Sequence, residues 1–532
     1  MNNSLYFSSR VFIPCLLVSL LFVMTGCIEN TEPERPNILF VISDDQSWLH
    51  TGATGDPVVK TPAFDKVAKE GLLFNNSFCT SPSCTPSRSS ILTGQEIWRI
   101  KQAGLLHSSI PPELPLVTHL LSDAGYHVGY TGKGWNPGDP YYLGLEQDPL
   151  VKAYNEQREG RIAQGISPVD YSANFNDFLE DRKEGEPFFF WFGAREPHRD
   201  YAFGIGKNEA GLESDLVEVP DFWPDVPFVR SDILDYYYEI MWFDTHVGSM
   251  IEKLEEIGEL DNTIVIVTSD NGMPFPRAKV NLYDWGTHMP LAIRWGDKIK
   301  SGRIIDDFVS HTDFAPTFLE AAGLPAPEQM TGKSLMNIFK SDKNGRIEMD
   351  RDKVFTALER HTYCRPDGAT YPIRALRTYD YLYLRNFEPD RWPTGGPDFI
   401  SSNKTTHGDV DACPIKSLIL VKQDIYPEEF DLCFGKRPSE ELYLVREDKS
   451  QVNNLADDPR FQSVKDSLVN ILTAHLKATG DPRIEGKDPW QNYVYHQYDG
   501  FGTVYNKILP ASERARARLR PSHQPKWVIE LD

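Results

Sequence analysis

Two predicted buried strands, 37–43 and 263–268, each lead into acidic or amide side chains. These side chains are Asp44, Asp45, Asp270 and Asn271. Ligands of open α/β sheets gather beyond the carboxyl ends of strands, so we expect the four groups to meet at one edge of a sheet. Four oxygen ligands favour a hard cation, calcium or alternatively magnesium, over zinc, which prefers nitrogen and sulfur. Each pair alone is also typical of an ordinary turn, because Asp and Asn are turn formers.

Cys84 opens a second chemical segment, Cys-Thr-Pro-Ser-Arg, which leads into an apolar helix. Pro86 is typical of a first helical turn, so Cys84 is expected at a helix N-terminus. Free N–H groups and the helix dipole favour an anion there. Arg88 adds a fixed charge that can pair with two oxygens of that anion. On these residues alone, a capped helix with an incidental cysteine is the alternative.

The scaffold that must position these groups is predicted to be α/β up to about residue 350, because strand-like and helix-like segments alternate. Continuous apolar strands indicate a mostly parallel, buried sheet. The clearest further elements are a helix over 116–124, an aromatic strand over 187–193, and a long helix capped by Ser231 that continues to Ile257.

The pattern changes near Lys353, where short strands follow one another closely. The expected strands are 354–358, 373–376, 381–384 and 441–445, with a helix over 461–476. Residues 385–440 are rich in Pro, Gly and Asp and are predicted to be long loops. We therefore expect a catalytic domain over 37–350 and a smaller C-terminal α+β subdomain over 351–532.

The first thirty residues have the features of an export signal. An apolar run follows Arg10 and is too short for a membrane span. It ends in Met-Thr-Gly-Cys27, which resembles a bacterial lipobox. We expect a signal peptide over 1–26, a lipid on Cys27 and a tether over 27–36. This places the protein in a bacterial cell envelope, anchored to the outer membrane and facing the periplasm or the outside; an ordinary signal peptide is the alternative.

The net charge of −22 provides no global basic field, which argues against a nucleic-acid partner. An anionic substrate would need a local cluster of cationic side chains and metal. Export permits disulfides, and Cys413 and Cys433 are candidates, although free buried thiols fit the sequence equally well.

The segment Cys84-Thr-Pro-Ser-Arg88, followed by Ser-Ile-Leu-Thr-Gly94, resembles the sulfatase signature. Both acidic strand ends stand in the family's order, and the resemblance covers nearly all of the mature chain. It implies an alkaline-phosphatase-like fold, in which helices flank a large, mostly parallel sheet and a smaller antiparallel sheet follows. The closest local resemblance, over 197–199, 270–276 and 371–374, is to heparan N-sulfatases (sulfamidases).

The resemblance also implies roles for individual residues. Cys84 would be oxidised by a formylglycine-generating enzyme to formylglycine (3-oxoalanine), whose hydrated diol attacks sulfur and later collapses to restore the aldehyde. The metal ligands would be Asp44, Asp45, residue 84, Asp270 and Asn271. Charge on the sulfuryl oxygens would be stabilised by the metal, Arg88 and Lys133. His198 would protonate the leaving oxygen, and Lys279 would bind sulfate beside it.

One position departs from the family pattern, because Trp135 stands where a histidine usually follows the motif lysine Lys133 by two residues. Tryptophan cannot exchange a proton. His288 is a candidate replacement. Together with His361 and Arg374, it is also a candidate contact for a polyanionic sugar, since planar and cationic groups suit sulfates and uronates.

The sequence therefore predicts a sulfatase acting on an O- or N-sulfated carbohydrate, such as ulvan or a heparan-like glycan. A phosphate ester hydrolase of the same superfamily is one alternative. A glycan-binding lipoprotein without catalysis is another, supported only by Trp135. The resemblance does not fix the substrate.

Overall fold

The computed structural model describes Met1 and residues 35–160, 163–401, 405–496 and 507–508. Its largest sheet has seven strands, four of which run parallel side by side. Across this sheet the order is β4 (His127–Gly132), β5 (Phe188–Gly193), β1 (Asn37–Ser43), β6 (Thr263–Ser269), β8 (Leu291–Arg294), β2 (Leu72–Phe74) and β9 (Arg303–Ile305). The predicted mostly parallel sheet is confirmed.

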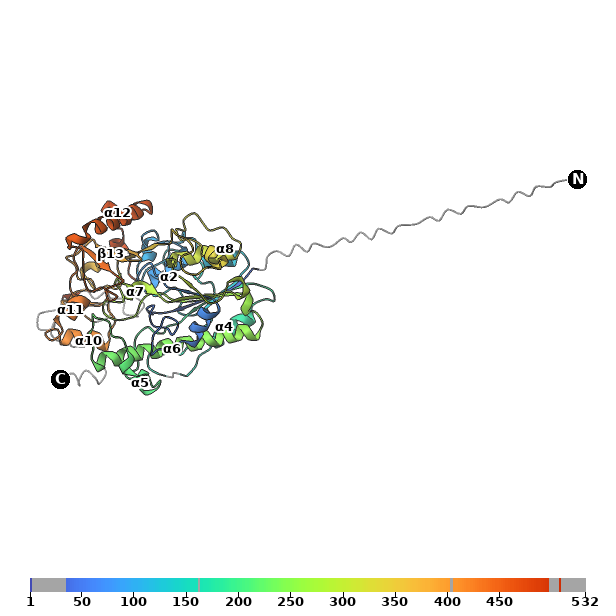
Figure 1. The fold of residues 1–532 in the computed structure, drawn as a ribbon, viewed down its shortest axis with the longest axis horizontal. Coiled ribbons are helices and arrows are strands. Elements are labelled where there is room, and N and C mark those ends of the chain that lie inside the picture. Colours follow the sequence, from blue (N-terminus) through green and yellow to red (C-terminus); the bar gives the residue numbers. More distant parts are fainter. Residues whose placement is uncertain (2–34, 161–162, 402–404, 497–506, 509–532) are drawn as a thin grey trace. The chain divides into compact units, whose positions relative to one another are not determined.

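Strand β1 is buried on both faces, which explains its continuous apolar sequence. Ile38, Phe40 and Ile42 pack into one core, and Leu39 and Val41 into another. Helices α2 (Cys84–Thr93), α3 (Val117–Asp123) and α8 (Phe314–Ala321) cover the first face. Helices α1 (Pro62–Glu70), α4 (Tyr171–Asp181) and α6 (Pro227–Glu256) cover the second. Figure 1 shows α2 and α8 on one side of the sheet and α4 and α6 on the other.

A second sheet of four antiparallel strands lies toward the C-terminus, as predicted. Its strands are β11 (Lys353–Leu358), β12 (Ile373–Thr378), β13 (Tyr381–Asn386) and β15 (Glu440–Leu444). Helix α12 (Gln462–Ala478) buries Leu468, Leu472 and Leu476 against it.

Short elements complete the described part. They are a small sheet of β3 (Ser77–Phe78), β7 (His288–Met289) and β10 (Val309–Ser310), the pair β14 (Phe399–Ile400) and β16 (Lys507–Ile508), and the helices α5 (Ile205–Asn208), α7 (Asp284–Thr287) and α9 (Met336–Lys340).

Two expectations about helices were wrong. Helix α6 begins at Pro227, not at Ser231, because proline is pre-organised for the first helical position. The predicted loop region 385–440 contains α10 (Pro414–Val421) and α11 (Pro427–Phe434), each with proline in its first turn. Two of the prolines that indicated loops here, Pro414 and Pro427, mark helix starts instead.

The open question of a Cys413–Cys433 disulfide is answered, because both are buried free thiols. The expected signal peptide, the lipid-bearing Cys27 and most of the tether lie outside the described residues. Among the residues described, no helix has the length and apolar character needed to cross a membrane.

Candidate active site

The four predicted metal ligands meet where β1 and β6 end, at the edge of the large sheet. The backbone N–H of Asp45 donates to Asp270 Oδ1 at 3.1 Å, and Asn271 Nδ2 donates to Asp45 Oδ1 at 2.6 Å. Asp45 has a φ of 76°, a conformation rarely adopted by residues other than glycine. Such strain is typical of functional sites and turns the Asp45 carboxylate back toward its neighbours.

Three cationic side chains neutralise the three carboxylates. Lys133 Nζ lies 2.6 Å from Asp44 Oδ2, and Lys279 Nζ lies 2.6 Å from Asp45 Oδ2. Arg88 Nε lies 2.8 Å from Asp270 Oδ2. Burial and the negative charge of Asp44 together raise the pKa of Asp270. Additional positive charge would therefore be favourable between these carboxylates.

Two buried polar atoms at this edge have no hydrogen-bond partner in the described structure: Asn271 Oδ1 and Arg88 Nη2. Such atoms are costly to bury unless a ligand satisfies them. Asn271 Oδ1 is an acceptor and, with the three carboxylates, forms an all-oxygen donor set suited to calcium or magnesium. Arg88 Nη2 is a donor suited to an anion. The donor set therefore fits a hard divalent cation.

Cys84 is the first residue of α2, as predicted, and all ten residues of this helix are buried. Its Sγ lies 3.4 Å from Asp44 Oδ1 and 4.0 Å from Asp45 Oδ1. Gly94 ends the helix with a φ of 63°, and its N–H donates to Ser90 O at 2.9 Å. The whole Cys84-to-Gly94 segment thus forms one rigid element aimed at the cluster of carboxylates.

Lys279 is presented by a strained loop. Arg277 and Val280 have φ values of 66° and 64°, and a β-branched residue such as valine is a genuine outlier in this region. The N–H of Val280 donates to Pro82 O at 3.0 Å, which ties this loop to the segment that precedes Cys84.

His198 faces the same cluster from the loop after β5. Its Nδ1 lies 2.6 Å from Arg199 O, so Nδ1 carries a proton and donates it there. Nε2 is left to face the site, 3.9 Å from Asp45 Oδ2, and the side chain is 30% exposed. His198 is therefore placed to exchange a proton with a molecule in the site.

Two cavities open from this cluster. One, of about 410 Å³, is lined by Cys84, Lys133, His198, Lys279, His361 and Asp411, among others. The other, of about 440 Å³, is lined by Asp44, Lys133, Asn155, Arg158, Arg195 and His198, among others. Both share Lys133, Pro137 and His198, so they extend in two directions from one point.

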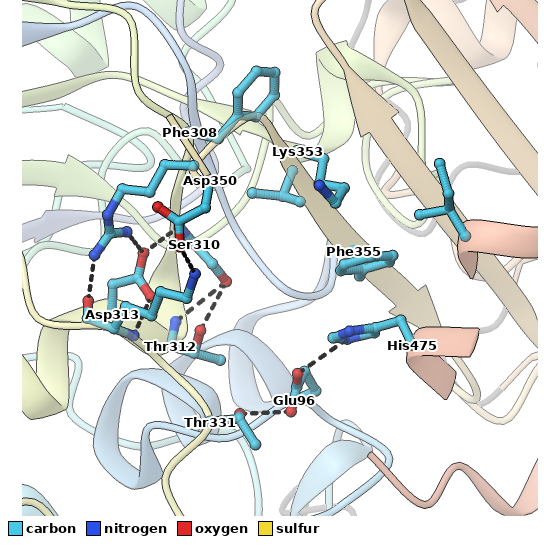
Figure 2. Close-up of a pocket in the computed structure, with 14 residues that line it drawn as sticks. Glu96, Phe308, Ser310, Thr312, Asp313, Thr331, Asp350, Lys353, Phe355 and His475 are labelled. Atoms are coloured by element: carbon cyan, nitrogen blue, oxygen red, sulfur yellow. Dashed lines mark hydrogen bonds and ion pairs between the residues drawn. The ribbon is translucent and has the colours of Figure 1, made fainter. Parts of the chain in front are cut away.

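A further cavity of about 470 Å³ lies away from Cys84 (Figure 2). In Figure 2, His475 faces Glu96 and lies flat beside Phe355, with ring centroids 3.5 Å apart. The charged groups of this cavity pair with one another; for example, Arg351 Nη1 lies 2.7 Å from Asp313 Oδ2. It therefore offers less to an anionic substrate than the cavity at Cys84 does.

Two of the three predicted substrate contacts do not reach these cavities. Arg374 is fully buried, with Nε 2.5 Å from Asp481 Oδ2 and Nη2 2.7 Å from Glu359 Oε1. His288 is stacked between Trp48 and Phe78, and its Nε2 lies 2.9 Å from Asn75 O. Both predictions are corrected, because these side chains are already committed to structural contacts. His361 does line the cavity with Cys84.

Trp135 points away from the reacting groups, because its Nε1 donates to Ser89 Oγ at 2.6 Å and its ring joins the core beneath α2. His288 cannot replace the family histidine from its stacked position. His107 and His361 line the cavity beside Cys84 instead, and His361 Nδ1 lies 2.8 Å from Ser83 Oγ. Neither His107 nor Asp411 was predicted from sequence, because both lie in segments with no motif around them.

Comparison with known families decides the family of the chain. The sulfatase family profile matches residues 36–324, which include every element that carries the cluster described above. The chain belongs to the sulfatase family. It is thus an enzyme that hydrolyses sulfate esters. A second profile, N-sulphoglucosamine sulphohydrolase, C-terminal, matches residues 278–392 of this sulfatase.

Relatives with assigned activities are consistent with this family assignment. An ulvan-active sulfatase of Formosa agariphila is 26% identical, over 84% of this sulfatase and 76% of the relative. Human N-sulphoglucosamine sulphohydrolase is 28% identical, over 85% of this sulfatase and 92% of the relative. A solved complex of a protein with its substrate D-glucosamine-2-N,6-O-disulfate shares the fold, with a TM-score of 0.63, 20% identity, and coverage of 85% of this chain and 100% of the other.

We expect His311, which is buried beneath α2, to make the stability of the fold sensitive to acid. Ser87 Oγ donates to Asp270 O at 2.6 Å, so it accepts from His311 Nδ1 at 3.0 Å, and His311 Nε2 is buried without a partner. Burial lowers the pKa of His311 from 6.5 to about 3. The unfolded chain therefore binds a proton below pH 6.5 that the folded chain does not, and stability falls as the pH drops.

We expect this residue to remove roughly 3 kcal/mol from the free energy of unfolding between neutral pH and about pH 4. His311→Gln should flatten the pH dependence by this amount, measured by denaturant unfolding at several pH values. Equal slopes for the variant and the wild type would show that His311 does not carry this acid sensitivity.

Proposed function

We propose that this sulfatase removes sulfate from a sulfated polysaccharide or oligosaccharide, using formylglycine at position 84 and one divalent cation, calcium or alternatively magnesium. The observation that carries the proposal is the placement of Cys84 at the buried start of α2, 3.4 Å from Asp44 and beside Lys133, Lys279 and His198. When present, the cation and the hydrated aldehyde would supply charge neutralisation and a nucleophilic hydroxyl.

The side chains of the protein would bind the sulfate group and transfer protons. Arg88, Lys133 and Lys279 hold the sulfuryl oxygens through charge-assisted hydrogen bonds, which strengthen as negative charge develops during transfer. In its doubly protonated form, His198 gives the proton on Nε2 to the departing oxygen or nitrogen of the sugar, while Nδ1–H stays bonded to Arg199 O. His361 or His107 then receives the proton that must leave residue 84 before a second turnover.

A carbohydrate substrate is supported by the relatives, which include enzymes named for ulvan and for N-sulphoglucosamine. It is also supported by two cavities that meet at the reacting groups, since a sugar and its neighbour in a chain can occupy one each. Both O-sulfate and N-sulfate fit the arrangement, because His198 can protonate either leaving atom.

A phosphate ester hydrolase is the second candidate, because the fold is shared with a phosphonate monoester hydrolase from Silicibacter pomeroyi, with a TM-score of 0.61 and 17% identity over 84% of this chain and 96% of the other. A two-metal phosphatase needs a second set of ligands. Asp45, His198 and Asp411 are close enough for one, but the ammonium of Lys279 already lies 2.6 Å from Asp45 and 3.2 Å from Asp411. This favours a one-metal sulfatase.

Sulfatase and phosphate ester hydrolase activity can be distinguished by measuring sulfate and phosphate release in parallel. The substrates are sulfated and phosphorylated oligosaccharides, including ulvan and heparan fragments. Removing divalent cations with a chelator should lower sulfate release by at least about 100-fold, because three carboxylates lose the charge between them. Added calcium or magnesium should restore it. Faster phosphate release than sulfate release, or full activity in the chelated enzyme, would count against the proposal.

We also propose that a formylglycine-generating enzyme matures the protein and that a lipid on Cys27 anchors it to the outer membrane of a bacterial envelope. The lipobox-like sequence before Cys27 supports the anchor. Mass spectrometry of membrane fractions would detect both modifications.

A further inference from the structure

Asp411 is a carboxylate inside the active-site cavity that the proposed chemistry does not use. Its side chain is 24% exposed, and Oδ2 lies 3.2 Å from Lys279 Nζ. One ligand-type atom each of Asp45, His198 and Asp411 lies within 4.8 Å of the other two. Asp411 therefore stands directly beside the proton donor and one of the sulfate-binding cations.

The loop that carries Asp411 is held firmly. Asp409 accepts from Thr362 N at 2.7 Å and from Arg365 Nη2 at 2.9 Å. Lys416 Nζ donates to His407 O at 2.9 Å and to Val410 O at 2.7 Å. Both flanks of Asp411 are fixed by buried charged groups, so its carboxylate is presented in one place and is not a mobile surface charge.

The two cavities differ in charge. The cavity that contains Asp411 has a carboxylate in its wall in addition to Lys279, which that carboxylate already pairs with. The other cavity also has a carboxylate in its wall, Asp44, but Asp44 pairs with Lys133 at 2.6 Å. Arg158 and Arg195, both exposed, line this second cavity as well, and Arg195 Nη2 lies 3.8 Å from Asp200 Oδ1. A second anion on the substrate is therefore repelled on one side of the reacting sulfate and attracted on the other.

We propose that Asp411 is a specificity-determining residue, which excludes a second sulfate or carboxylate from the substrate ring on the His361 side of the scissile sulfate. Anionic neighbours in the chain are directed to the cavity with Arg158 and Arg195. The preferred ring thus carries one sulfate and no further anionic group on that side, for example only hydroxyl groups. This inference rests on the proposed function, because it assumes that sulfate occupies the site at Cys84.

The alternative role for Asp411 is to hold Lys279 in position. The two roles differ in what Asp411→Asn does, because asparagine keeps the size and a hydrogen-bonding oxygen but loses the charge. Substitution of a specificity residue changes the ratio of kcat/KM between two substrates that differ only in charge. Substitution of a residue that only positions Lys279 changes kcat/KM by the same factor for every substrate.

The test uses two aryl sulfates, 4-nitrophenyl sulfate with carboxylates at both ortho positions and the same ester with carboxamides. Substitution on both sides places one group toward Asp411 whichever way the ring turns. The measured quantity is the ratio of kcat/KM for the carboxylate ester to kcat/KM for the carboxamide ester. Asp411→Asn should raise this ratio about tenfold or more above that of the wild type, whereas Asp411→Glu should leave it near the wild-type value, since the charge is kept. An unchanged ratio in Asp411→Asn would overturn the inference.

The affinities of Cys84→Ala and of Cys84→Ala/Asp411→Asn for the same two esters are also measured by calorimetry. This measurement needs no turnover. If the binding ratio shifts by about tenfold while the wild type releases no sulfate, the inference stands and the proposed reaction fails. If sulfate is released and neither ratio shifts, the reaction stands and the inference fails.

Discussion

Cys84→Ala is expected to lower sulfate release by at least about 10⁴-fold, because it removes the group from which the nucleophile is made. All other parts of the site would remain, since the first turn of α2 is fixed by Ser87 and Arg88 as well as by residue 84. Binding of the sulfate group should therefore survive while turnover is lost. The measurement is sulfate released per enzyme, with the mass of the peptide containing residue 84 recorded in parallel.

Cys79 provides a matched control five positions earlier. It is also fully buried, but its Sγ lies near Gly286 O, at 3.7 Å, and it does not line either cavity at the site. Cys79→Ala should keep activity within a few-fold of the wild type, at a modest cost in stability. A Cys84→Ala enzyme with a tenth or more of wild-type activity would mean that residue 84 is not the source of the nucleophile.

The second large effect is on stability, and it concerns Arg374. This guanidinium joins β12 to Glu359 and Asp481, and all three side chains have no exposed surface. Arg374→Met keeps much of the volume but leaves Asp481 as a buried, unpaired charge. We expect the free energy of unfolding to fall by about 3–5 kcal/mol, measured by denaturant unfolding.

The matched control is Arg446→Met, in an ion pair with Asp380 at 2.6 Å in which both side chains are at least half exposed. Solvent-exposed pairs contribute little, so this variant should lie within about 1 kcal/mol of the wild type. Similar values for the two variants would contradict the structural role assigned to Arg374.

Much of the architecture could be predicted from sequence because its signals are local. The apolar strands β1 and β6, the proline in the first turn of α2 and the change to short strands at Lys353 each reflect a single physical rule. The region 385–440 could not be predicted, because proline and aspartate occur both in loops and at helix starts. Only the packing of α10 and α11 against the core decides between these two structures.

The site was predictable where a motif surrounds the residue. Cys84, Lys133, His198 and Lys279 do gather at the carboxyl ends of the strands. Arg374 and His288 show the limit, since a cationic or aromatic side chain looks the same in sequence whether it faces a ligand or a buried partner. Asp411 is the opposite case, a residue that lines the cavity but was not predicted to do so. An acidic residue in a Pro- and Asp-rich stretch gives no sign that its loop folds back over the cavity.

The complete burial of α2 has a consequence for the timing of maturation. Cys84 is 2% exposed, and every other residue of its helix is buried as well. A modifying enzyme must take an extended stretch of chain into its own active site, and the folded protein offers none here. The conversion that we propose for Cys84 therefore has to occur while the chain is still unfolded. A molecule that folds before it is modified should therefore stay inactive while it is folded, so the fraction of active protein depends on the rate of oxidation relative to the rate of folding.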